Sequence, residues 1–140
     1  MDREKHLELI QGVINRMASN SFHLKGWSVV LVSALFALAG KDKAVYFVYL
    51  AYLPAIAFWV LDGYFLWQER MYRKLYDAVR KEKDPNSDFS MNAYRYRTEV
   101  KSWLATCVST TLLIFHGMVV AAVLIAMALM LLLGSQPSGT

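Results

Sequence analysis

Three long apolar blocks, at residues 24–40, 44–67 and 103–133, constrain what this chain can fold into. The charged residues gather between these blocks, and 56% of the 140 residues are hydrophobic, above the roughly 45–50% of a soluble domain. Apolar runs as long as a bilayer is thick are typical of transmembrane helices. The pattern predicts an all-α polytopic membrane protein with about three transmembrane helices, an amphipathic N-terminal helix and a helical cytosolic extension.

Residues 1–23 are expected to form the cytosolic amphipathic helix. The apolar side chains of this segment recur at helical spacing: Leu7, Ile10, Ile14 and Met17. A Ser-Asn-Ser run at 19–21 permits a bend after it. The charged region before the first block is 23 residues long and holds acids as well as bases. It therefore differs from the start of a signal peptide, and we interpret residues 24–40 as a span.

Residues 24–67 are expected to form a transmembrane hairpin that turns at residues 40–43. The first span would rise about 25 Å, and Lys25 can extend its ammonium group to one membrane interface. The second span contains Pro54, which predicts a kink. Nothing in the sequence breaks the helix where the apolar residues end. We therefore expect it to continue into water as the start of a basic cytosolic helix and loop, residues 68–102.

The last block, residues 103–133, is too long for a single span. As one helix it would rise about 46 Å, against a hydrocarbon core of about 30 Å. We expect a break at residues 115–117, which would divide the block into an interfacial segment and a third transmembrane helix. A bent or re-entrant block is the alternative. Residues 134–140 are predicted to form a disordered tail.

The distribution of lysine and arginine predicts the orientation of the spans. Residues 1–25 hold four basic side chains, residues 68–102 hold nine, and the turn at residues 41–43 holds two. Positive charge favours the cytoplasmic side. The N-terminus and the 68–102 segment are therefore expected to be cytoplasmic, and three spans would place the C-terminus outside.

Asp62 is the most informative single residue, because a carboxylate inside a bilayer is costly and faces protein or water. We favour a buried ion pair or hydrogen bond to a basic residue or tyrosine of a neighbouring helix. The alternative is a cation site at a pore. His116 is the second candidate for a pore or selectivity role, because an imidazole in contact with water titrates near neutral pH. Four polar residues could line a conduit or could bond to their own helix: Thr106, Ser109, Thr110 and His116.

Basic and aromatic side chains alternate in the sequence YRYR, residues 94–97. Arg95 and Arg97 could bind phosphate while Tyr94 and Tyr96 stack on bases. The alternative, which we favour, is an anchor in the lipid headgroup layer. Further candidates for ligand phosphate lie on the cytosolic extension of the second span: Arg73, Lys74 and Arg80.

The sequence holds no motif that indicates catalysis. Gly-rich phosphate loops, zinc-protease motifs and nucleophile elbows are absent, and a single cysteine, Cys107, excludes a cysteine-based metal cluster. Arg16 and His23 have the R-x6-H spacing of some ribonucleases, but such sites need a soluble helical dimer. We expect no enzyme activity, no cofactor and no bound metal.

Two stretches carry a resemblance, HLELIQGVINRMASNSFHLKGWSVVLVSALFALAG at residues 6–40 and FWVLDGYFLWQERMYRKLYDAVR at residues 58–80. They resemble a family of small bacterial multi-span membrane proteins associated with anti-phage defence operons. The Hailong-type membrane effector is the nearest analogy. The resemblance implies a multimeric channel in the inner membrane, controlled by a nucleotide or oligonucleotide that a partner nucleotidyltransferase makes. It assigns no ligand residue.

Three spans cannot enclose an aqueous path alone, so a channel requires a homo-oligomer. The sequence thus leads to the hypothesis of an ion-conducting homo-oligomer in the bacterial inner membrane, gated by a nucleotide signal or by a cytosolic partner protein. A non-conducting membrane adaptor that recruits a soluble enzyme through its basic cytosolic helices is the alternative.

Overall fold

The computed structural model of the chain describes residues 2–42, 44–82 and 88–134. Every regular element in these residues is helical, which confirms the all-α class. The elements are α1 (Arg3–Asp42), α2 (Tyr46–Lys81), the 3-10 helix η1 (Ala93–Tyr96), α3 (Trp103–Cys107) and α4 (Thr110–Gly134).

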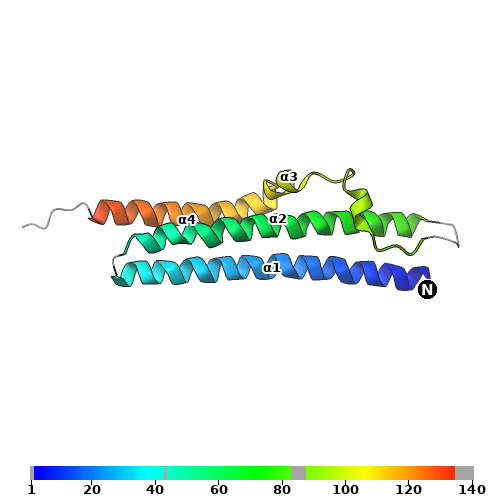
Figure 1. The fold of residues 1–140 in the computed structure, drawn as a ribbon, viewed down its shortest axis with the longest axis horizontal. Helices are drawn as coiled ribbons and strands as arrows, with labels where there is room; N and C mark the ends of the chain where they lie inside the picture. Colours follow the sequence, from blue (N-terminus) through cyan, green and yellow to red (C-terminus); the bar gives the residue numbers. More distant parts are fainter. Residues whose placement is uncertain (1, 43, 83–87, 135–140) are drawn as a thin grey trace, which may run out of the picture.

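The long helices α1 and α2 lie antiparallel and side by side along their whole length (Figure 1). The third long helix, α4, runs along the first half of α2, α3 lies over the middle of α2, and η1 lies over the second half. Because α2 contacts every other element, it is the axis on which the rest of the chain packs.

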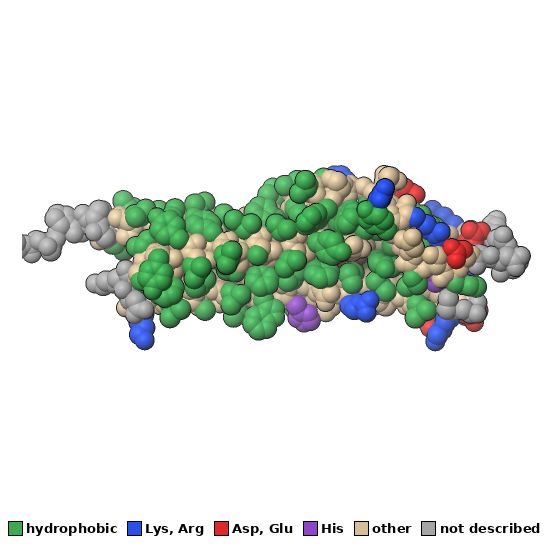
Figure 2. All heavy atoms as spheres, in the orientation of Figure 1, with side chains coloured by type: hydrophobic (Ala, Val, Ile, Leu, Met, Phe, Trp, Pro, Cys, Tyr) green, Lys and Arg blue, Asp and Glu red, His purple; other side chains and the backbone are tan. Residues whose placement is uncertain are grey.

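Helices α1, α2 and α4 are each long and apolar enough to cross a membrane. Yet α1 alone would rise about 60 Å, twice the thickness of a hydrocarbon core. In the space-filling view, hydrophobic side chains cover the end where α4 lies, and charged side chains gather at the opposite end (Figure 2). We call these two ends the spanning half and the polar half. The three long helices could thus cross a membrane together, and α1 and α2 are longer than a crossing requires.

The N-terminal segment and the first span form one unbroken helix, although residues 19–21 would permit a bend. Serine hydroxyls bend helices when they compete for backbone partners. The Ser21 hydroxyl instead donates a hydrogen bond to the carboxylate of Asp62 on α2. A tertiary contact therefore keeps α1 straight at this point.

The last apolar block does divide into a short and a long helix, but the expected position at residues 115–117 was wrong. The break lies at Val108 and Ser109, between α3 and α4. The indole N–H of Trp59 donates a hydrogen bond of 2.8 Å to the carbonyl of Cys107, at the end of α3. His116 and Gly117 lie inside α4.

The polar half is held together by a hydrophobic cluster between α1, α2 and η1. The fully or nearly buried members are Ile10, Ile14, Met71, Leu75, Val79 and Ala93. The apolar stripe predicted for the N-terminal segment thus packs on the buried face of the α2 extension. Arg3 adds two hydrogen bonds of 2.9 Å to the carbonyls of Arg80 and Glu82, at the end of α2.

A second cluster joins the three helices in the spanning half. Its buried members are Val32 and Ala39 of α1, Val48, Ala51 and Ala55 of α2, and Val123 of α4. Small side chains allow membrane helices to approach closely. Helix α2 continues through Pro54 without interruption.

Parts of two sequence expectations fall outside the described residues. Of the helix and loop expected at residues 68–102, residues 83–87 are not described, and residues 88–90 form no helix or strand. Of the tail expected at residues 134–140, only Gly134 is described, at the end of α4.

Adjacent residues of α1 test the cluster in the polar half. Ile10 is fully buried, whereas Leu9 is 44% exposed. We expect Ile10→Ala to lower the free energy of unfolding by about 2–5 kcal/mol, because it leaves a cavity, and Leu9→Ala to change it by less than about 0.5 kcal/mol. Thermal unfolding of the purified chain in detergent, followed by tryptophan fluorescence, measures both. Equal destabilisation by the two variants would show that α1 does not pack on α2 here.

Candidate functional site

The Asp62 carboxylate is fully buried and is bonded from both neighbouring long helices. From α1, the Lys25 ammonium lies 2.5 Å from Asp62 Oδ2, and Ser21 donates to Oδ1. From α4, His116 Nε2 lies 2.8 Å from Oδ2. Lys25 also donates a hydrogen bond of 2.8 Å to the Ser21 hydroxyl. We call Ser21, Lys25, Asp62 and His116 the buried polar network.

All three spans contribute to this network at the same depth. Asp62 lies about 24 Å along α2 from Tyr46, at the opposite end of the spanning half. His116 lies about 26 Å from the apolar end of α4, and Lys25 about 25 Å from the end of α1. Since a hydrocarbon core is about 30 Å thick, the network lies just inside the boundary where the polar half begins.

Aromatic side chains close the network on the side of α4. The ring of Trp59 stacks on that of His116 with centroids 5.8 Å apart and an interplanar angle of 8°. The Lys25 ammonium lies 5.9 Å from the centroid of Phe115. Among the described residues, His116 Nδ1 is buried with no hydrogen-bond partner. Asp62 and His116 are therefore enclosed by protein, Ser21 and Lys25 are partly exposed, and one ring nitrogen of His116 is left unused.

Gly63 and Cys107 make the closest approach between α2 and α3. A Cβ atom at Gly63 would lie 2.3 Å from the sulfur of Cys107, so no larger residue fits. Burial raises the pKa of the Cys107 thiol, and the Asp62 carboxylate raises it further. A neutral thiol is a poor nucleophile, and we assign Cys107 a packing role.

The geometry agrees with the ion-pair interpretation of Asp62, with Lys25 as the basic partner from a neighbouring helix. Lys25 turns inward to Asp62 instead of extending to the membrane interface. Thr106 donates a hydrogen bond of 3.0 Å to the carbonyl of Ser102. This agrees with the alternative in which the polar residues bond to their own helix and do not line a conduit. The pore role of Asp62 and His116 stays a prediction.

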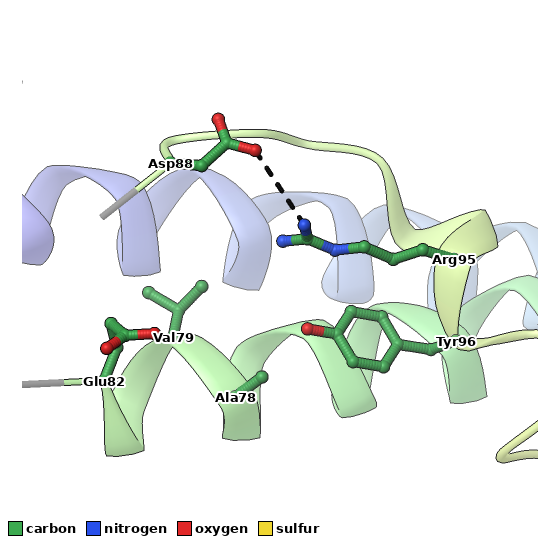
Figure 3. Close-up of a pocket in the computed structure, with 6 residues that line it drawn as sticks. All are labelled: Ala78, Val79, Glu82, Asp88, Arg95 and Tyr96. Carbon is green, nitrogen blue, oxygen red and sulfur yellow. Dashed lines mark ion pairs between the residues drawn. The ribbon is translucent and has the colours of Figure 1, made fainter. Parts of the chain in front are cut away.

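The four residues of the YRYR motif do not share one site. Arg95 and Tyr96 line a pocket of about 320 Å³ with Ala78, Val79, Glu82 and Asp88 (Figure 3). Arg95 points across this pocket to Asp88, with 3.8 Å between the charged atoms. The other two residues pair with each other, since the Arg97 guanidinium lies 4.7 Å from the ring centroid of Tyr94. The pocket holds two carboxylates for one arginine, which opposes the binding of phosphate.

The remaining predicted ligand residues lie elsewhere on α2. Arg80 pairs with Asp77 at 3.5 Å. Arg73 pairs with Glu69 at 2.7 Å and lines a groove with Lys74, Arg70 and Lys101. The structure thus brings Arg73 and Lys74 together and keeps them apart from the pocket of Arg95. A ligand role for any of them stays a prediction.

The sequence interpretation missed the roles of Ser21, Lys25 and Trp59. A signal for the first two was present, because Ser21 and Lys25 are four residues apart and share a helix face. Lys25 is also the only lysine or arginine in the first span, residues 24–40, and a buried acid needs a cationic partner. No local pattern indicated Trp59.

No family model, curated protein or solved structure matches this chain. Within the described residues, no three side chains of His, Cys, Asp or Glu gather in a way that could hold a metal ion. The candidate site is therefore defined by its own geometry alone.

The contact between Gly63 and Cys107 gives a test of the α2–α3 packing. We expect Gly63→Ala to lower the unfolding temperature, because the added methyl group meets the sulfur. Replacing the sulfur in Gly63→Ala/Cys107→Ala should restore most of the loss. The measurement is thermal unfolding in detergent, with Gly12→Ala on α1, where a Cβ meets nothing within 4 Å, as the control. Equal loss in the single and double variants would contradict this packing.

Proposed function

We propose that the chain is a membrane effector of bacterial anti-phage defence that assembles into a homo-oligomeric ion channel in the inner membrane. The observation that carries the proposal is the buried polar network. Lys25 and Asp62 are charged residues inside otherwise apolar spans, and ionisable residues in spans commonly mark ion pathways or their gates. The defence role rests on the resemblance of residues 6–40 and 58–80.

The shape of the single chain supports the oligomer in this proposal. Three helices packed around a shared cluster leave no aqueous path between them. Helix α4 also presents small residues that this chain does not use. A Cβ at Gly117 would meet nothing within 4 Å, and Ala121 is exposed. Such a pair, four residues apart, suits close packing against a helix of a second copy.

The buried polar network would act as the latch of this channel. It lies where the polar half joins the spanning half, and α1 and α2 pass through it without a break. A force on the polar half would therefore reach Lys25 and Asp62 through rigid helices. Separating this pair would expose a carboxylate to the path, and a carboxylate favours cations.

The polar half would be cytoplasmic and would receive the signal. Its excess of lysine and arginine favours this orientation and suits an anionic nucleotide or oligonucleotide. Arg73, Lys74, Arg80 and the YRYR motif remain the candidate contacts, either for such a ligand or for a partner protein.

One observation favours a non-conducting adaptor as the second candidate. The two charged residues inside the spans, Lys25 and Asp62, neutralise each other within one chain. An adaptor would need them only as a structural lock, and its basic cytosolic helices would recruit a soluble enzyme.

A planar bilayer experiment separates these two functions. We expect the full chain to pass current, and a member of a panel of nucleotides and short oligoadenylates to change that current. Asp62→Asn should weaken the latch and lower cation selectivity, seen as a reversal potential closer to zero in a KCl gradient. Asp77→Asn, in the polar half, is the matched control and should leave the reversal potential unchanged. Bilayers that stay silent with every ligand would contradict the channel and favour the adaptor.

A further inference from the structure

We infer that α2 and the segment before α3 form a binding site for the phosphate of an anionic lipid headgroup. The site consists of two hollows that share Arg70 and Lys101. One, of about 390 Å³, is also lined by Arg73, Lys74, Asp77 and Val100. The other, of about 530 Å³, is also lined by Ala105, Val108, Ser109, Thr110 and Thr111. We call the two together the basic groove. The inference does not depend on ion conduction.

Arg73 is the one cation of the basic groove that pairs with a carboxylate, Glu69, among the described residues. Among the described residues, no carboxylate forms an ion pair with Arg70, Lys74 or Lys101. Arg70 makes one long hydrogen bond, 3.4 Å, to the hydroxyl of Thr106. Asp77, the one acid in the lining, pairs with Arg80. Three free cations from two chain segments therefore meet in one concave surface, which favours an anion.

The groove lies at the depth of lipid headgroups. Arg70 is about 36 Å along α2 from Tyr46, and a tilt of about 20° reduces this to about 34 Å. Beyond a core of about 30 Å, each headgroup layer is about 5–8 Å thick, so this position on α2 lies in that layer. From there the Arg70 side chain reaches to the hydroxyl of Thr106 on α3.

The lining of the basic groove changes from basic to less charged toward α4, as the headgroup and the acyl chains of a lipid would require. The hollow toward the polar half is bordered by Arg73 and Lys74, and the hollow toward α4 by Ala105, Val108 and the exposed hydroxyl residues Thr110 and Thr111. A phosphate between Arg70 and Lys101 would thus direct its glycerol and acyl chains toward the spanning half. A soluble nucleotide has no acyl chain that would lie along Val108 and the spanning half. The observations therefore favour a lipid.

Short-chain lipids test the site on the full chain in a neutral detergent. We expect dioctanoyl phosphatidylglycerol to raise the unfolding temperature in a saturable way. Dioctanoyl phosphatidylcholine, inorganic phosphate and AMP at the same concentrations should not. Arg70→Gln and Lys101→Gln should each weaken the apparent affinity for phosphatidylglycerol about fivefold, the loss expected for one basic side chain at an anionic surface.

Two controls keep the result specific. Lys81→Gln removes a cation from the same helix outside the groove and should leave the affinity unchanged, and Arg70→Lys should retain most of it. Lys101 makes no hydrogen bond through its side chain among the described residues, so its variant should fold normally. Equal binding of phosphatidylcholine, equal binding of AMP with the same losses in the variants, or an equal loss in Lys81→Gln would each overturn the inference.

Discussion

The ion pair between Lys25 and Asp62 is the interaction on which the rest of this structure depends. A buried carboxylate without a partner is costly, and removing one partner of such a pair typically destabilises a protein by about 3–5 kcal/mol. Here α1 supplies the cation and a hydroxyl, and α4 supplies an imidazole. Because burying the Asp62 carboxylate without partners would be costly, its bonds to α1 and α4 fix the positions of these two helices relative to α2.

The same contact explains why the two halves of the molecule form one unit. In the spanning half, the three long helices pack through small residues. In the polar half, Ile10 and Leu75 belong to a cluster of the kind found in soluble proteins. Because α1 and α2 cross this boundary unbroken, neither half can rotate without straining the network. This continuity is the physical basis for proposing that a signal at the polar half reaches the membrane.

Local sequence patterns predicted the number of spans and the apolar face of the N-terminal segment, because both depend on residues close together in the sequence. Hydropathy alone indicates three spans, and the spacing of Ile10 and Ile14 indicates a helix face that needs a partner. The break in the last block could not be placed in this way. It depends on Trp59, which is 48 residues away from the Cys107 carbonyl that it bonds. The role of Ser21 likewise could not be predicted from the residues around it, because its hydrogen-bond partner, Asp62, lies on α2. The basic groove joins Arg70 and Lys101, which only the tertiary structure brings together.

A double-mutant cycle between Asp62→Asn and Lys25→Gln tests this ion pair most directly, measured as the free energy of unfolding of the full chain in detergent. We expect each single change to destabilise the chain and the double change to cost far less than their sum. The coupling energy should exceed the roughly 0.2–1 kcal/mol of an exposed pair. The pair of Lys5 and Glu8, 3.9 Å apart at the surface, gives the reference value. Additive effects at Asp62 and Lys25 would contradict the claim that this ion pair holds the spans together.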